Sequence, residues 1–229
     1  MSKYIRTAII GAGITGLYLA WKLSEQGHDV KIFEAKEQVG KDSCSGLISN
    51  RILNFIPQAD KFSDNKIKKA EINFPSRTVT LNFSNDFLVI NRSELDKELL
   101  KIAKQEGAEI EFNNYIESLP DNFDYILGCD GANSQVRRLL DLERPDYRLG
   151  IRGFTEKSSQ KNLVETWPVE NGFIWKIPRK EKIEYGIMAS TQEAKILLDE
   201  FLKEREVSLE QTSSDLIGHG LSFSSEENL

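Results

Sequence analysis

The sequence predicts an α/β fold, in which a Rossmann-like domain of parallel strands is interrupted by an inserted antiparallel β-sheet domain. Near the start, a short apolar strand runs into a glycine-rich turn and then a helix. Residues 67–90, and again the stretch from Gly150, alternate apolar and polar side chains with the period of two that is typical of antiparallel strands. Between these stretches, helix and strand patterns alternate as they do in the first segment, which favours one divided parallel-sheet domain.

The first element is a strand over residues 4–10, followed by a glycine turn and a helix over roughly residues 13–26. Gly11, Gly13 and Gly16 form the pattern G-x-G-x-x-G. The first glycine permits a tight turn, the second lets the backbone approach a pyrophosphate, and the third lets the helix pack close to the strand. Phosphates would bind the N–H groups at the positive end of the helix. The cofactor-binding loop that we predict also contains Ala12, Ile14 and Thr15.

A second strand, at residues 29–33, ends in Glu34, at the distance from the glycines that a ribose-binding carboxylate requires. Such a carboxylate accepts the two hydroxyls of an adenosine ribose and repels a 2′-phosphate. Together with the glycine pattern it predicts an FAD or NAD site, with Glu34 and Ala35 beside the adenosine. The alternative is a glycine-rich turn without a ligand.

Composition excludes several classes of function. The chain has 229 residues, enough for one large domain or two interleaved ones, and its net charge is −6 without a basic block. This disfavours nucleic acid as a partner. Two cysteines and two histidines are too few for a disulfide framework or a metal site. With no signal peptide and no apolar run long enough to span a bilayer, we expect a cytoplasmic protein with at most peripheral membrane contact.

We place the cofactor-binding domain in residues 1–62 and 88–149, the inserted domain in 63–87 and 150–206, and a loose tail in 207–229. Within the inserted domain, Pro75-Ser76 and Ser84-Asn85 are expected to separate strands. Amphipathic patterns predict helices that begin near Asn91 and near Thr191.

Two further segments are candidates for the site. A polar loop at residues 35–48 contains Cys44, and loops that follow parallel strands are where doubly wound sheets hold ligands. The Cys44 thiol would face a flavin or substrate, or else be a small buried apolar group. A later apolar strand, 123–129, ends in Cys129, which we assign mainly to the core, and leads directly into the turn Asp130-Gly131.

With these segments in view, the sequence resembles FAD-dependent oxidoreductases of the hydroxybenzoate-hydroxylase fold group. That group shares an inserted antiparallel substrate domain and an Asp-Gly motif after a late strand, here Asp130-Gly131. Two segments resemble geranylgeranyl reductases in particular. Cys44-Ser45-Gly46 is similar to their Cys-x-Gly loop, and residues 168–178 are similar to their Pro…Tyr-x-Trp-x-Phe-Pro motif, with Phe173 for Tyr and Ile177 for Phe.

The resemblance implies a role for each matched position. Cys44 would lie by the isoalloxazine as the candidate catalytic proton donor, and Phe173, Trp175 and Pro178 would line an apolar tunnel for a polyprenyl chain. The implied FAD-binding residues are those of the glycine loop together with Glu34, Ala35, Lys41, Cys44, Ser45, Gly46, Arg92, Asp130 and Gly131. The plain structural alternatives are core packing for the two aromatic residues, a solvated helix start for Arg92, and an ordinary turn for Asp130-Gly131.

The implied reaction is reduction of C=C bonds in a geranylgeranyl lipid by hydride from reduced FAD, with NAD(P)H or ferredoxin as electron donor. The family also carries a later Gly-Asp motif, which nothing after Ala189 supplies, since Asp215 lacks the glycine. We therefore expect one of three cases: a truncated product, a complementing chain that carries this motif, or weaker binding of FAD. The corresponding alternative function is a truncated or split half-enzyme that binds nucleotide or prenyl lipid without catalysis alone. An aromatic monooxygenase that uses NAD(P)H-reduced FAD is the alternative enzyme.

Overall fold

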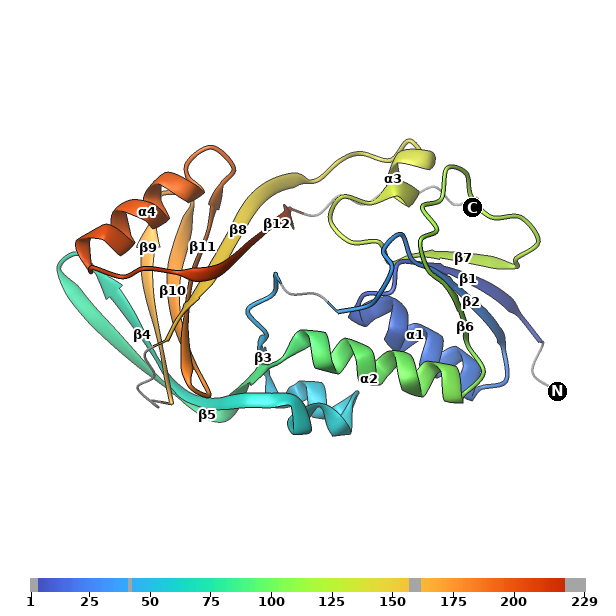
Figure 1. The fold of residues 1–229 in the computed structure, drawn as a ribbon, viewed down its shortest axis with the longest axis horizontal. Helices are drawn as coiled ribbons and strands as arrows, with labels where there is room; N and C mark the ends of the chain where they lie inside the picture. Colours follow the sequence, from blue (N-terminus) through green and yellow to red (C-terminus); the bar gives the residue numbers. More distant parts are fainter. Residues whose placement is uncertain (1–3, 41–42, 157–161, 221–229) are drawn as a thin grey trace. The chain divides into compact units, whose positions relative to one another are not determined.

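The computed structural model describes residues 4–40, 43–156 and 162–220 (Figure 1). Within these ranges the chain divides into two compact units, the first made of residues 4–40, 93–146 and 220, and the second of 43–92, 147–156 and 162–219. The elements in chain order are β1 (Arg6–Ile10), α1 (Ile14–Glu25), β2 (Asp29–Phe33), β3 (Leu47–Ser49), the 3-10 helices η1 (Asn50–Asn54) and η2 (Pro57–Phe62), β4 (Ser63–Phe74), β5 (Arg77–Ile90), α2 (Arg92–Gln105), β6 (Glu109–Glu111), β7 (Tyr125–Gly128), α3 (Gln135–Leu139), β8 (Asp146–Thr155), β9 (Leu163–Val169), β10 (Gly172–Arg179), β11 (Lys182–Ser190), α4 (Ala194–Glu204) and β12 (Glu210–His219).

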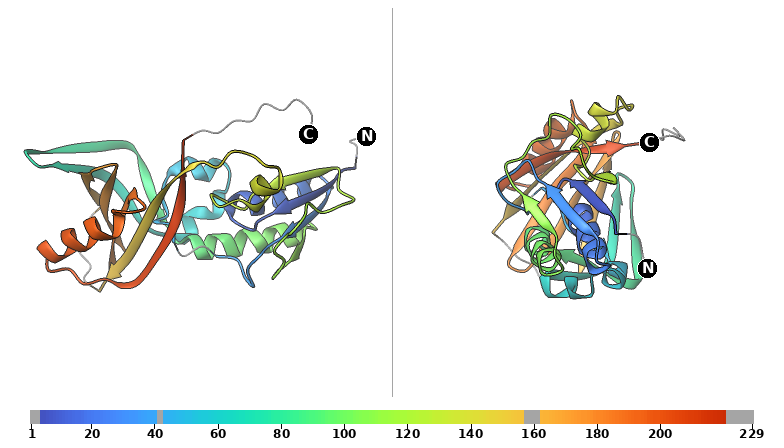
Figure 2. Two further views of the ribbon diagram at one scale, coloured as in Figure 1. Left: turned by 90° about the horizontal axis from the view of Figure 1, so that it is seen from above. Right: turned by 90° about the vertical axis from the view of Figure 1, so that its right-hand side faces the viewer.

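The first unit is built on a parallel sheet with the strand order β6-β2-β1-β7. Strand β1 is central and almost wholly buried because its apolar residues face covering layers on both sides of the sheet. Helices α1 and α2 lie against the same side of this sheet (Figures 1 and 2). The predicted Rossmann-like α/β fold is therefore confirmed.

The helices of this unit follow the apolar pattern of the sequence. Helix α2 buries Leu95, Leu99 and Ala103, which recur with helical spacing along one face. It has 14 residues, too few to cross a bilayer. In the described ranges no helix is both long and apolar enough to span a membrane.

The second unit is an eight-stranded sheet with the order β12-β8-β11-β10-β9-β4-β5-β3. Most neighbouring strands whose register is determined run antiparallel to each other, and β4 and β9 are the exception because they run parallel. The predicted inserted sheet is therefore present, and it is a mixed sheet. Helix α4 packs on one face of this sheet, where Leu198, Phe201 and Leu202 join Tyr185 and Ile187 of β11 in a buried cluster. Figure 1 shows α4 along this sheet.

The expected loose tail is wrong for Glu210–His219, which forms the edge strand β12 beside β8. The serine- and threonine-rich sequence of β12 shows no clear strand pattern. Two glycines of β8 leave the space that β12 occupies. A Cβ at Gly150 would lie 2.9 Å from Cδ1 of Ile217, and one at Gly153 would lie 2.9 Å from Cγ2 of Thr212. Small residues in β8 thus let β12 pack closely against that strand.

Two other expectations about the inserted domain are corrected. Ser84-Asn85 does not separate two strands, because β5 continues through it and pairs with β4 as one long hairpin around Pro75-Ser76. The described residues of 42–62 and 88–92 belong to the second unit and not to the cofactor-binding one. They do so because β3 pairs with β5, which attaches the segment from Leu47 onward to the mixed sheet.

Candidate functional site

The glycine loop of the first unit has one open position and two closed ones. Gly11 has φ +102°, and a Cβ there would lie 2.6 Å from the carbonyl oxygen of Cys129. At Gly16 a Cβ would overlap the carbonyl oxygen of Gly11. At Gly13 a Cβ would meet nothing within 4 Å. Gly11 and Gly16 are thus required by the turn and by helix packing, whereas Gly13 leaves free space in front of the backbone.

The N–H groups that face this space are those of a helix start. The first hydrogen bond within α1 runs from Leu17 N to Gly13 O at 2.9 Å, so the N–H groups of Ile14, Thr15 and Gly16 precede it. No side chain caps the helix at Gly13. Backbone N–H groups at a helix N-terminus, beside an open glycine, fit the two phosphates of a dinucleotide.

Glu34 lies at the end of β2 beside this loop. Its Oε2 accepts a hydrogen bond from Ala12 N at 2.6 Å, and its Oε1 accepts one from Lys36 N at 3.0 Å. These bonds orient the carboxylate, and each oxygen keeps acceptor capacity for a ribose hydroxyl. The neighbouring Ala35 is exposed. Of the predicted FAD-binding residues, Lys41 lies outside the described residues.

Asp130 caps a helix. Its Oδ1 accepts from Ser134 Oγ at 2.6 Å, and its Oδ2 accepts from the N–H groups of Gln135 at 2.6 Å and Val136 at 3.1 Å. The carboxylate therefore stabilises the start of α3. Gly131 has φ +83° and open space at its Cβ position, so the backbone of this turn leaves room for a ligand.

Cys129, beside this turn, is a poor nucleophile. Burial, and secondly the charge of Asp130, raise the pKa of its thiol from 9.0 to about 11. In a Cys44→Ser variant, where Cys129 is the remaining cysteine, we expect alkylation by iodoacetamide to be slow at pH 8.5 and to accelerate only as the pH approaches 11, since the thiolate is the nucleophile. Mass spectrometry measures the rates, with circular dichroism as the check that the fold persists. A half-maximal rate near pH 9 would contradict this assignment.

In the second unit, Cys44 lies in a loop fixed at several points. Its Sγ accepts from Gly46 N at 3.4 Å and from Arg92 Nη1 at 3.5 Å. Gly46 has φ +67°, and a Cβ there would overlap the carbonyl oxygen of Ile90. The hydroxyl of Ser43 donates to Oδ2 of Asp215 at 3.0 Å, so β12 also holds this loop. The structure therefore joins three predicted site residues, Cys44, Gly46 and Arg92.

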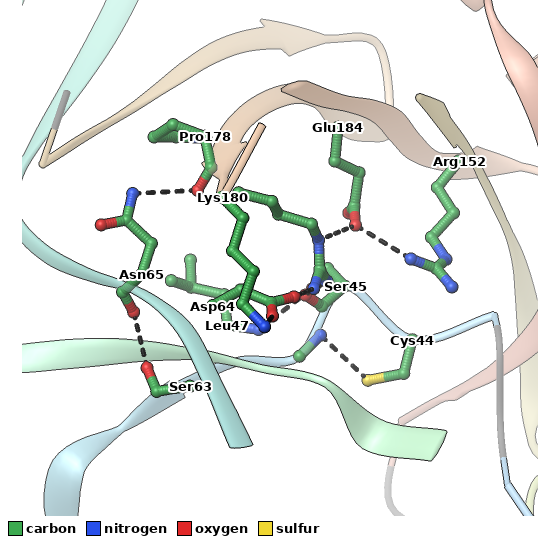
Figure 3. Close-up of polar contacts among 12 residues, drawn as sticks. Cys44, Ser45, Leu47, Ser63, Asp64, Asn65, Arg152, Pro178, Lys180 and Glu184 are labelled. Carbon is green, nitrogen blue, oxygen red and sulfur yellow. Dashed lines mark hydrogen bonds and ion pairs between the residues drawn. The ribbon is translucent and has the colours of Figure 1, made fainter. Parts of the chain in front are cut away.

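A buried charge cluster, which the sequence did not predict, lies beside the loop (Figure 3). Glu184 is 0% exposed. Its Oε2 accepts from Arg152 Nη1 at 3.0 Å and from Arg179 Nε at 2.9 Å. Its Oε1 accepts from the indole N–H of Trp175 at 2.9 Å. Buried charges require such partners, and here one carboxylate serves two guanidinium groups.

Arg179 connects this cluster to the Cys44 loop. Besides Glu184, it binds Oδ2 of Asp64 through Nη1 at 2.9 Å, and its Nη2 donates to the carbonyl oxygen of Ser45. Lys180 Nζ contacts the other oxygen of Asp64 at 3.2 Å. All three guanidinium nitrogens of Arg179 are thus bound, and they tie the loop to the start of β4 and to β11. In the sequence, Arg179 and Glu184 stand out only as charged residues within strand patterns, and such residues usually face solvent.

The predicted substrate residues fall on two faces of the mixed sheet. Trp175 pairs with Gly186 in the register of β10 and β11, and Phe173 pairs with Met188, so the two aromatic side chains share one face. A Cβ at Gly186 would overlap the Trp175 ring, which shows that the indole lies directly over this glycine. Pro178 is buried and, by strand alternation, lies on the opposite face. Of the three predicted substrate residues, only Phe173 and Trp175 therefore share a face.

The predicted residues thus form two groups, each within one unit. The first unit holds the glycine loop, Glu34 and the Asp130-Gly131 turn. The second holds the Cys44 loop with Arg92, the charge cluster and the two aromatic residues. The first group has the donors of a dinucleotide site, and the second has a thiol and an apolar sheet face beside buried charges.

Known proteins match this chain in parts. A model of the NAD(P)-binding Rossmann-like domain matches residues 9–54. Kynurenine 3-monooxygenase of Flavobacterium psychrophilum is 26% identical over 173 residues, 61% of this chain and 38% of that protein. Digeranylgeranylglycerophospholipid reductase 2 of Methanopyrus kandleri is 31% identical over 106 residues, 45% of this chain and 26% of that protein. The chain therefore spans less than two-fifths of either relative.

Solved structures extend the likeness to nearly the whole chain. A geranylgeranyl bacteriochlorophyll reductase-like protein of Thermoplasma acidophilum has a TM-score of 0.82 at 19% identity, covering 94% of this chain and 66% of that one. PqsL, a probable FAD-dependent monooxygenase of Pseudomonas aeruginosa, has a TM-score of 0.70 at 20% identity, covering 95% and 68%. The chain has the Rossmann-like α/β fold of FAD-binding oxidoreductases. At these identities the likeness concerns the fold, and reductases and monooxygenases share it.

Proposed function

We propose that this chain is the FAD-binding and substrate-binding part of an oxidoreductase that reduces C=C bonds of a geranylgeranyl or similar prenyl lipid. The observation that carries the proposal is the Cys44 loop, in which the thiol contacts Arg92 and Arg179 fixes the backbone at Ser45. A thiol so positioned, in a unit whose sheet carries Phe173 and Trp175 on one face, suits chemistry on an apolar substrate. Both the reductase resemblance of this loop and the reductase-like structural neighbour support it.

FAD is the proposed cofactor because the glycine loop offers what its pyrophosphate needs. The N–H groups of Ile14, Thr15 and Gly16 would hold the phosphates, and Gly13 leaves space for them. Glu34 would accept the hydroxyls of the adenosine ribose. When bound in its reduced form, FAD would supply the hydride. NAD(P)H or ferredoxin is the electron donor that we propose for its reduction.

The residues of the second unit would perform the remaining tasks. Phe173 and Trp175 would orient the apolar chain of the substrate and exclude water from it. Cys44 would hold the proton that the second alkene carbon takes up when the first receives hydride. Arg179 would keep the Cys44 loop in place through the carbonyl of Ser45. In the proposed reaction, each reduced C=C bond of the lipid gains one hydride and one proton.

A reconstitution assay tests this function. The chain, loaded with FAD and reduced with dithionite, is incubated with a geranylgeranyl lipid, and mass spectrometry follows the gain of hydrogen. Cys44→Ser is expected to slow the reduction by about 100-fold, as for loss of a general acid, whereas Cys129→Ser is expected to leave it unchanged. Unchanged turnover in Cys44→Ser would remove the thiol from the chemistry. If the lipid stays unsaturated when incubated with the FAD-loaded wild type, the proposed reductase function would be overturned.

An aromatic monooxygenase is the second candidate. Kynurenine 3-monooxygenase and rifampicin monooxygenase are among the relatives, at 26% and 28% identity. NAD(P)H-driven consumption of O₂ that depends on an aromatic substrate would favour this reaction over lipid reduction.

We also propose a complementing chain that carries a Gly-Asp motif. Stable FAD retention by this chain alone would count against the need for such a partner.

A further inference from the structure

Strand β12 is fixed on the mixed sheet at the residues that surround Asp215. At the end of the strand, Nε2 of His219 lies 3.1 Å from Nη2 of Arg148 in β8. In the middle, Gly150 of β8 has no side chain, and a Cβ there would lie 2.9 Å from Cδ1 of Ile217 and 3.7 Å from the carbonyl oxygen of Asp215. The backbone of Asp215 is therefore held against β8, and its side chain extends from a fixed position.

The Asp215 side chain contacts a residue that is distant in sequence. Its Oδ2 accepts a hydrogen bond from the hydroxyl of Ser43 at 3.0 Å, across 172 positions of the chain. Both residues are half-buried. Ser43 immediately precedes Cys44, and both belong to the same compact unit as β12. Because a hydrogen bond to a carboxylate is stronger than one between neutral groups, this contact ties the start of the Cys44 loop to β12.

The other side of Cys44 is held by a different contact. Arg179 Nη2 donates to the carbonyl oxygen of Ser45, the residue that follows Cys44. The Cys44 thiol makes a weaker contact of its own, because its Sγ lies 3.5 Å from Arg92 Nη1 and sulfur is a weak acceptor. The position of the thiol is therefore set mainly by the residues that flank it, with Ser43 held from β12 and Ser45 held from β10.

We propose that Asp215 is a positioning residue for the Cys44 thiol, which it holds through the hydroxyl of Ser43 in the place from which the proton is delivered. This inference deepens the proposed function, on which it rests, by assigning control of the thiol to a strand outside the Cys44 loop. Displacing a reacting group by about 1 Å reduces a rate by up to about 100-fold, so one hydrogen bond at the adjacent residue affects turnover. Asp215 acts through Ser43 and exchanges no proton with the substrate.

The reactivity of the Cys44 thiol tests this assignment without any lipid. All variants are made in a Cys129→Ser background, and mass spectrometry follows alkylation of Cys44 by iodoacetamide over a range of pH. We expect Asp215→Ala to raise the rate on the order of 5-fold at every pH, the effect of losing one hydrogen bond, because the loop opens more often. Asp215→Asn keeps an acceptor for the Ser43 hydroxyl without the charge, and it is expected to keep the rate of the background protein.

A double-mutant cycle locates the effect in the contact between Ser43 and Asp215. Ser43→Ala is expected to raise the alkylation rate as much as Asp215→Ala does, and the double variant is expected to react no faster than either single variant. Ser214→Ala, at an exposed neighbour in the same strand, is the control and is expected to change nothing. An unchanged rate in Asp215→Ala, additive effects in the double variant, or an Asp215→Asn protein that reacts like Asp215→Ala would each overturn the proposal.

Circular dichroism checks that each variant folds. If Asp215→Ala does not fold, Ser43→Ala carries the test, and an unchanged rate in that variant would overturn the proposal.

Turnover of the FAD-loaded protein separates this inference from the function on which it rests. In the lipid-reduction assay, Asp215→Ala is expected to lower kcat by about 10-fold with KM unchanged, and Asp215→Asn is expected to restore most of the loss. A wild-type kcat in Asp215→Ala would overturn the inference. The expected alkylation rates, combined with a lipid that the wild type does not reduce, would overturn the proposed function alone. Lipid reduction by the wild type, combined with unchanged alkylation in Asp215→Ala, would overturn this inference alone.

Discussion

Gly13→Ala is expected to weaken FAD binding by about 100-fold, equivalent to about 2.7 kcal/mol, while the fold stays intact. Gly13 has φ −75°, which alanine adopts without strain, and its Cβ would meet no protein atom within 4 Å. The methyl group would instead occupy the space through which the pyrophosphate approaches the start of α1. Fluorescence titration with FAD measures the affinity, and thermal unfolding measures the stability.

Gly16→Ala is the contrasting variant of the same loop. Its Cβ would overlap the carbonyl oxygen of Gly11, so α1 would have to move away from β1, and we expect a marked loss of stability. The two alanine substitutions therefore separate binding from folding. A Gly13→Ala protein that binds FAD as tightly as the wild type would show that the open glycine does not face the cofactor.

Glu184→Ala is expected to destabilise the second unit by about 3–5 kcal/mol, the usual cost of removing one partner from a buried ion pair. The substitution would leave Arg152 and the Nε of Arg179 without their carboxylate, and the Trp175 indole without its acceptor. Urea unfolding followed by tryptophan fluorescence and circular dichroism measures the change. Glu181→Ala is the control: Glu181 is exposed in the turn that precedes β11, and its loss is expected to change stability little.

The response of Glu184→Ala also tests how the charge cluster is organised. A loss below about 1 kcal/mol would mean that the two arginines find water or other partners, as surface ion pairs do. That result would contradict the view that Glu184 holds Arg152, Arg179 and Trp175 together.

Local patterns predicted the first unit well. The glycine motif and Glu34 lie close together in sequence, so strand, turn and helix are specified by adjacent residues, and β1, α1 and β2 form as expected. The contact between Glu34 and Ala12 N follows from the same local geometry. The Cys44 loop was also identified from its own residues, Cys44-Ser45-Gly46, and the structure gives Gly46 a positive φ of +67°.

Long-range packing explains what the sequence did not reveal. The strand β12 has too little alternation to be recognised, and it forms because Gly150 and Gly153 of a distant strand leave room for it. The charge cluster joins Arg152, Arg179 and Glu184 from three strands, and no local pattern brings them together. Pro178 was assigned to the substrate surface by its motif, but strand alternation turns it to the other face of the sheet.

Absorption spectroscopy of the purified wild-type chain, mixed with FAD and then desalted, tests the central claim most directly. If the glycine loop and Glu34 bind FAD as proposed, the protein will keep the visible bands of oxidised flavin through desalting, and Gly13→Ala will lose them. A colourless wild type, with a circular dichroism spectrum that shows a folded protein, would contradict FAD binding by this chain alone.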